Sequence, residues 1–109
     1  MSALSEITSD TFQAEVLDVS HEKPVAIDFW ATGCGPCDLQ TPLLEKIANE
    51  HPAAVTLVQS NAGENVSLAR KIGVQSVPEL VVFRNGAESA NLAGSQQRPA
   101  IMEALGHAE

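Results

Sequence analysis

Two cysteines, Cys34 and Cys37, are the residues best suited to chemistry in this sequence of 109 amino acids. They are three positions apart, and two thiols at that spacing either form a reversible disulfide or supply half of a zinc site. Zinc needs four ligands, but the chain has no second cysteine pair, and no ligand-like spacing is found among the histidines, His21, His51 and His107. The ligand count favours redox chemistry over a metal site, and we assign the histidines no role.

The residues around the two thiols predict that they lie where a strand gives way to a helix. Residues 25–31 form an almost unbroken apolar run, which indicates a strand buried on both faces. A helix to about residue 50 follows, with Pro36 in its first turn and apolar residues at helical spacing, namely Leu39, Leu43, Leu44, Ile47 and Ala48. A helix N-terminus shifts a nearby thiol toward thiolate. We therefore expect Cys34, at the mouth of the turn, to be the attacking thiol and Cys37, directed inward, to be the resolving thiol.

The other elements predict an α/β fold with a central mixed sheet that has helices on both faces. Asp10 and Gln13 have the spacing of a capping box for a first helix over residues 11–18. Asn85-Gly86 predicts a two-residue hairpin turn. The patterns predict further strands over residues 3–7, 54–58, 79–83 and 87–92, and further helices over residues 65–72 and 97–107.

Composition limits the classes of partner. The 14 acidic and 6 basic side chains give a net charge of -8, which disfavours nucleic acid and anionic membranes as partners. The length of 109 residues is that of a single domain, over residues 1–109. Residues 1–7 lack the basic residue and the long apolar run of a secretion signal, and no later run could span a bilayer, so we expect a cytoplasmic protein.

Several motifs occur together with the cysteine pair. Residues 29–37 read Phe-Trp-Ala-Thr-Gly-Cys-Gly-Pro-Cys, Val77-Pro78 follows 41 residues after the second cysteine, residues 83–86 read Phe-Arg-Asn-Gly, and Gly94 comes next. In this set the sequence resembles the thioredoxin family over nearly its whole length. The resemblance implies a thioredoxin fold and a thiol-disulfide oxidoreductase that reduces protein disulfides. It implies no metal and no bound cofactor beyond a redox-active Cys34–Cys37 disulfide, with electrons drawn from NADPH through a thioredoxin reductase. The expected partners are protein disulfides and that reductase, and we expect a monomer.

The resemblance also implies roles for residues around the thiols. Asp28 stands within the apolar strand, where an ionised carboxylate is costly. By resemblance it lies beneath Cys37 and passes protons to it through water; the alternative is a rim position that faces solvent. Pro78 is by resemblance cis and faces the dithiol, while a trans proline at the start of a strand is the alternative. The expected substrate-binding residues are Trp30, Gly33, Gly35, Pro36, Val77, Pro78 and Gly94. The alternative for Trp30 is that it only packs against the active-site turn. The alternative for Gly94 is that it is an ordinary turn glycine.

Four positions depart from the family pattern. Gly33 replaces a tryptophan, Asp38 a lysine, Gln59 a lysine and Gly63 an aspartate. Gly33 removes a broad apolar contact, and the charge of Asp38 opposes thiolate formation. Gln59 leaves Asp28 without a cation. We therefore expect the pKa of Asp28 to be higher than in a thioredoxin that has that lysine. Three alternatives stay open, namely a docking module with incidental cysteines, a dedicated reductant of one target, and an oxidase or isomerase that runs the chemistry in reverse. The reducing compartment that we expect argues against the last of these.

Overall fold

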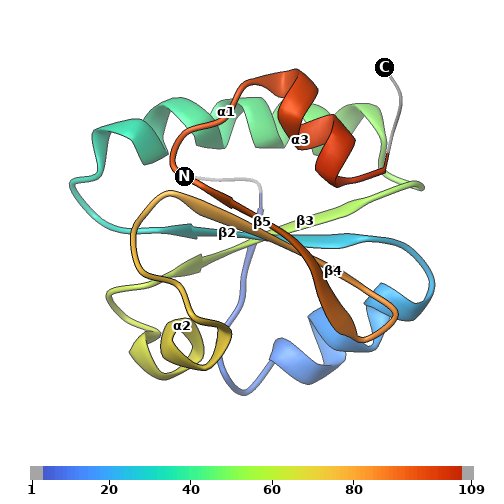
Figure 1. The fold of residues 1–109 in the computed structure, drawn as a ribbon, viewed down its shortest axis with the longest axis horizontal. Coiled ribbons are helices and arrows are strands. Elements are labelled where there is room, and N and C mark those ends of the chain that lie inside the picture. The colour runs from blue at the N-terminus through green and yellow to red at the C-terminus, as the bar shows by residue number, and fades with distance from the viewer. Residues whose placement is uncertain (1–3, 107–109) are drawn as a thin grey trace.

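The strands of the chain form one sheet with helices on both faces, in a computed structural model that describes residues 4–106 (Figure 1). In chain order the strands are β1 (Ser5–Glu6), β2 (Val25–Trp30), β3 (Thr56–Asn61), β4 (Glu79–Arg84) and β5 (Ala87–Ala93). The helical segments are a π-helical turn η1 (Gln13–Leu17), a 3-10 turn η2 (Val19–His21), α1 (Gly35–Glu50), α2 (Val66–Ile72) and α3 (Arg98–Ala104). None of the helices within residues 4–106 is long and apolar enough to cross a membrane.

The sheet is mixed, with the order β1-β3-β2-β4-β5. The pairs β1–β3 and β3–β2 are parallel, whereas β2–β4 and β4–β5 are antiparallel. The α/β prediction is therefore confirmed. Strand β2 is central, and its residues from Val25 to Phe29 are all buried, as the apolar run predicts.

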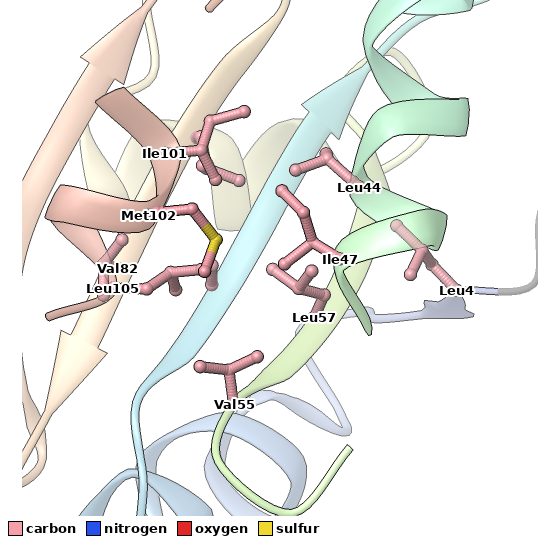
Figure 2. Close-up of a cluster of buried hydrophobic side chains, with 11 residues drawn as sticks. Leu4, Leu44, Ile47, Val55, Leu57, Val82, Ile101, Met102 and Leu105 are labelled. Carbon is pink, nitrogen blue, oxygen red and sulfur yellow. The ribbon is translucent and has the colours of Figure 1, made fainter. Parts of the chain in front are cut away.

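Alternate residues of the central strands face two different helix layers, because successive side chains in a strand point to opposite faces. Ala26 of β2 belongs to the core beneath α1 and α3, and Ile27 belongs to the core above η1 and α2. Figure 1 shows these helices on opposite sides of the sheet. In the close-up, side chains from α1 and α3 meet over the strands, among them Leu44, Ile47, Ile101 and Met102 (Figure 2).

The first helical segment differs from its prediction at its start. Phe12 stands at the N-cap of η1 and receives no side-chain cap, so the predicted capping box is wrong. The amide of Gln13 reaches forward instead and donates to Asp18 at 2.7 Å. Phe12 and Val16 are both buried, so the apolar face that predicts a helix is real.

Strand β3 lies further along the chain than residues 54–58. The backbone N–H of Val55 still donates to the carbonyl of His51 at 3.2 Å, so the chain is turning out of α1 at that point. The strand then runs to Asn61 through polar residues that find partners inside the protein. The hydroxyl of Ser60, for instance, donates to the carbonyl of Ile7 at 2.8 Å. Because these residues are polar, the sequence pattern does not predict that the strand continues through them.

The remaining predictions agree with the structure to within a few residues. Asn85 and Gly86 have φ of 53° and 78°, as a two-residue turn with both central residues in the left-handed region requires. α2 ends at Gly73 in the left-handed conformation, which is typical of a helix C-terminus. Residue 3 of the first predicted strand and residue 107 of the last predicted helix lie outside the described residues.

Candidate active site

Cys34 and Cys37 are joined by a disulfide, with their Cα atoms 5.3 Å apart. Cys34 is the N-cap of α1, and its Sγ accepts a hydrogen bond from the backbone N–H of Cys37 at 3.1 Å. Its own N–H donates to the carbonyl of Ala31 at 3.3 Å, which closes the turn out of β2. The predicted location between strand and helix is therefore confirmed, and one N–H of the first helical turn, that of Cys37, lies beside the Cys34 sulfur.

The two cysteines differ in exposure. Cys37 is 1% exposed, while Cys34 is only partly buried, between the exposed Gly33 and Gly35. Pro36 is also exposed and occupies the first turn of α1, where its missing N–H costs no helix bond. The arrangement offers one sulfur to a partner and keeps the other inside. The described residues contain no cluster of three or more side chains of the kinds that bind metals.

Asp28 is completely buried in the middle of β2, so the alternative of a rim position is wrong. Its Oδ1 accepts a hydrogen bond from the Gln40 amide at 3.4 Å, whereas Oδ2 accepts none from any residue between 4 and 106. Burial raises the pKa of Asp28 to about 7, the Gln40 hydrogen bond opposes that rise, and the charge of Glu6 adds to it. A carboxyl with this pKa can take up and release a proton near neutral pH.

Gln59 faces Asp28 in the register of β2 and β3, at the position that carries a lysine in the family pattern. Its amide donates to Glu6 at 3.2 Å and makes no hydrogen bond to Asp28. Burial is the main cause of the raised pKa of Asp28, so the further rise expected from the missing lysine, relative to a family member that carries it, stays a prediction.

The buried face of α1 carries Cys37, Gln40, Leu44 and Ile47. Leu39 is 78% exposed, so its predicted place on the apolar face is wrong. The spacing from Cys37 to Gln40 is three residues, which brings them to the same side of the helix. Gln40 is a residue of the candidate site, hydrogen-bonded to Asp28, that sequence reasoning missed. The sequence contains a signal for it, because Gln40 is a polar residue at helical spacing from Cys37, Leu44 and Ile47 and so falls on the same face.

The loop before β4 carries the Val77–Pro78 peptide bond, which is cis, as the resemblance implies. The carbonyl of Pro78 accepts a hydrogen bond from the N–H of Gly94 at 2.8 Å, so two of the predicted site residues are brought together. Glu79, which is 4% exposed, accepts from the N–H of Gln75 at 3.5 Å and from the Asn91 amide at 2.8 Å. These bonds hold the loop against β5.

Gly94 and Gly33 both have a left-handed backbone, with φ of 82° and 80°. A Cβ added at either position would stand in open space, clear of non-adjacent residues by 4 Å. The backbone conformation, and not lack of space, therefore explains glycine at both sites.

Trp30 ends β2, and its indole N–H donates to the carboxylate of Glu6 at 3.2 Å. The same carboxylate accepts from the backbone N–H of Asn61 at 2.6 Å. Glu6 is thus a second residue that sequence reasoning missed. No sequence signal points to it, because it is an exposed residue in a two-residue strand.

A pocket of about 370 Å³ adjoins the dithiol turn. Ala31 of that turn and Val77 of the cis-proline loop both line it. Small or apolar residues form most of the rest of the wall, including Ala62, Gly63, Val66 and Val74. The pocket is therefore continuous with two segments that the sequence predicts for substrate binding.

Comparison with known proteins agrees with this geometry. A family model described as Thioredoxin matches residues 3–107. Thioredoxin 1 of Nostoc sp. (strain PCC 7120) is 34% identical over 105 residues, which cover 96% of each chain. A thioredoxin of Streptomyces clavuligerus is 40% identical over 99 residues, or 91% of this chain and 90% of that one. The bifunctional thioredoxin reductase/thioredoxin of Mycobacterium leprae is 37% identical over 100 residues, which cover 92% of this chain but 21% of that protein. The chain belongs to the thioredoxin family, and it is a thioredoxin-type protein-disulfide reductase with Cys34 and Cys37 as its redox pair.

Proposed function

We propose that Cys34 attacks the disulfide of a protein substrate and that Cys37 resolves the mixed disulfide. The single observation that carries this assignment is the asymmetry of the pair. Cys34 is partly exposed, and its sulfur accepts an N–H from the first turn of α1, whereas Cys37 is 1% exposed. In the reduced protein the same N–H and the helix N-terminus favour the thiolate of Cys34, which is the nucleophile.

The reaction transfers two electrons from the dithiol to the substrate. The Cys34 thiolate attacks one substrate sulfur, which forms a mixed disulfide and releases the other substrate sulfur as a thiolate that takes up a proton. Cys37 then loses its proton and attacks the Cys34 sulfur. This step releases the second substrate thiol and leaves the Cys34–Cys37 disulfide, which is the form in the structure.

Asp28 assists the second step in this proposal. Cys37 must lose a proton inside the protein, and the buried carboxyl of Asp28 has a pKa of about 7. Asp28 bonds to Gln40, which lies one helical turn from Cys37 on the buried face of α1. The carboxylate accepts the proton of Cys37 through water, and returns one when the pair is reduced again.

Substrate binding is assigned to the residues around the dithiol and the cis-proline loop. The backbone of Val77 pairs with the substrate chain, and the pocket beside Ala31 and Val77 supports this location because it offers an apolar recess. The proposed binding residues are those expected from the sequence, namely Trp30, Gly33, Gly35, Pro36, Val77, Pro78 and Gly94.

The oxidised pair must be reduced again, and we assign this step to a thioredoxin reductase that draws on NADPH. The name of the Mycobacterium leprae relative, which joins a reductase and a thioredoxin in one protein, supports such a partner. We further propose that residues 1–109 act as one domain, as a monomer, in the cytoplasm.

Single cysteine replacements test the assignment. Cys37→Ser should trap a mixed disulfide between Cys34 and a protein substrate such as insulin, while Cys34→Ser should trap none. The Cys34→Ser/Cys37→Ser double variant should lose insulin reduction. A docking module would keep its binding partners in the double variant, and equal trapping by both single variants would contradict the assigned roles.

A dedicated reductant remains the second candidate, favoured by exposed Asp38 at the start of α1 and by Gly33 before Cys34. Insulin reduction driven by NADPH and a bacterial thioredoxin reductase separates the two. A general reductant turns over under these conditions. A dedicated one fails, although dithiothreitol still supports insulin reduction through the same pair.

A further inference from the structure

Gln40 is a buried amide with a partner at each end. It is 2% exposed on the inner face of α1. Its Oε1 accepts the backbone N–H of Gln96 at 2.7 Å, and its Nε2 donates to Asp28 Oδ1 at 3.4 Å. A backbone N–H can only donate, so the amide oxygen must face Gln96 and the NH2 group must face Asp28. The loop after β5 therefore determines the orientation of the amide.

This orientation distinguishes the two oxygens of the Asp28 carboxyl. Oδ1 faces an NH2 donor and can only accept from it, so a proton on the carboxyl belongs on Oδ2. Oδ2 is the oxygen that accepts no hydrogen bond from the described part of the chain. It is thus the atom of Asp28 that is available to exchange a proton.

The other end of the amide leads to the cis-proline loop. The Gln96 side chain donates to the carbonyl of Ala93 at 2.9 Å and to that of Gly94 at 3.3 Å. The N–H of Gly94 in turn donates to the carbonyl of Pro78 at 2.8 Å. A chain of hydrogen bonds therefore runs from Asp28 through Gln40 and the loop after β5 to Pro78.

We propose that Gln40 is a positioning residue, which holds the Asp28 carboxyl with Oδ2 as its proton-carrying oxygen and ties that carboxyl to the substrate-facing loop of Gly94 and Gln96. The inference rests on the proposed roles of Asp28 and Gly94 and adds the residue that connects them. One side chain thereby joins the proton-transfer part of the site to its substrate-binding part.

Within residues 4–106, Gln40 is the residue that donates a hydrogen bond to Asp28. Across β2, the register partner on β3 is the neutral Gln59 and that on β4 is the apolar Leu80. The charged group that acts on Asp28 is Glu6 of β1, and Cys37 of α1 is held in the disulfide. Replacement of Gln40 changes neither Glu6 nor the cysteines, so its effect on Asp28 can be measured separately.

Two replacements at Gln40 test the two ends of the amide. Gln40→Leu removes both hydrogen bonds at similar volume, whereas Gln40→Glu keeps an oxygen for the Gln96 N–H and replaces the NH2 donor to Asp28 with a second carboxyl oxygen. In the oxidised protein, the 13C NMR titration of the Asp28 carboxyl should move to higher pH by about one unit in Gln40→Leu, and also upward in Gln40→Glu. Hydrogen exchange at the Gln96 amide should become about tenfold faster in Gln40→Leu, but not in Gln40→Glu.

Ile47→Val is the control, since it trims the same face of α1 two turns away and leaves both hydrogen bonds of Gln40 in place. If the role of Gln40 is purely structural, its variants lose stability but the Asp28 titration stays at the wild-type pH. That result would overturn the proposal. So would an equal shift in Ile47→Val, or unchanged Gln96 exchange in Gln40→Leu. The pH profile of insulin reduction separates this inference from the proposed function. If the titration moves and the rate profile does not, the Gln40 link stands and the catalytic role of Asp28 fails.

Discussion

The indole N–H of Trp30 and the amide of Gln59 both donate to the same carboxylate oxygen of Glu6, each at 3.2 Å. Together with the N–H of Asn61, which donates to the other oxygen, they tie the edge strand β1 to the ends of β2 and β3. The charge of Glu6 also raises the pKa of Asp28. An exposed residue of a two-residue strand thus acts on both the tryptophan beside the site and its buried carboxyl.

Glu6→Gln should lower the pKa of Asp28, because a neutral amide removes the negative charge that disfavours ionisation. The measurement is a 13C NMR titration of the Asp28 carboxyl in the oxidised protein. Glu103→Gln, an exposed replacement on α3, provides the control. An unchanged Asp28 midpoint in Glu6→Gln would show that solvent screens the interaction.

Gln59→Lys should also lower the pKa of Asp28, since it places a cation opposite Asp28 in the register of β2 and β3. The pH dependence of insulin reduction should shift to lower pH in step with the titration. Gln59→Met removes the bond to Glu6 without adding a charge and serves as the matched variant. If the pH dependence of insulin reduction that follows the ionisation of Asp28 is the same in both variants as in the wild type, the prediction is wrong.

Asp28→Asn should stabilise the oxidised protein at pH 8 and have little effect near pH 4. The folded pKa of about 7 lies above the ordinary value of 3.8, so between these values the folded chain holds a proton that the unfolded chain has lost. The free energy of unfolding of the wild type therefore falls by up to about 4 kcal/mol as the pH rises through this window. Urea denaturation followed by Trp30 fluorescence measures the difference.

The exposed Asp10→Asn variant is the control for Asp28→Asn. It should unfold with the wild-type pH dependence. A stability gain in Asp28→Asn that stays the same from pH 4 to pH 8 would show that Asp28 does not hold its proton more tightly in the folded chain.

Gly33→Ala should destabilise the oxidised protein by about 1–2 kcal/mol, because a residue with a Cβ is strained at a φ of 80°. Gly33→Asn should cost less, since asparagine tolerates the left-handed region. A Cβ at this position would stand in open space, so crowding does not enter the comparison. Equal losses in the two variants, measured by urea denaturation, would contradict the backbone explanation.

Asp38→Asn should make Cys34 of the reduced protein react about two- to threefold faster with iodoacetamide at pH 7 and low salt. Asp38 is exposed in the first turn of α1, so its charge opposes a thiolate at that helix end. The gain should shrink in 1 M salt, where exposed charges are screened. A gain that persists in high salt would indicate a change in the turn and not in its charge.

Much of the framework is visible in the sequence because it depends on neighbours along the chain. The apolar run of residues 25–31 predicts a central strand, Pro36 marks the start of α1, and Asn85-Gly86 predicts its hairpin from local turn chemistry. Asn61 and Gln40 were not predictable in this way. Their burial depends on partners far along the chain, as in the bonds from Asn61 to Glu6 and from Gln96 to Gln40, which span 55 and 56 residues.

The sequence by itself determined the redox pair. Two cysteines three residues apart at the start of a helix can react as a pair because of residues that are neighbours along the chain. Only the tertiary structure decided the proton affinity of Asp28. A carboxyl in an apolar run could face either solvent or core, and its pKa depends on the protein that surrounds it. Burial in β2, the amide of Gln40 and the charge of Glu6 come from three separate parts of the chain, and they meet only when the sheet and α1 have assembled.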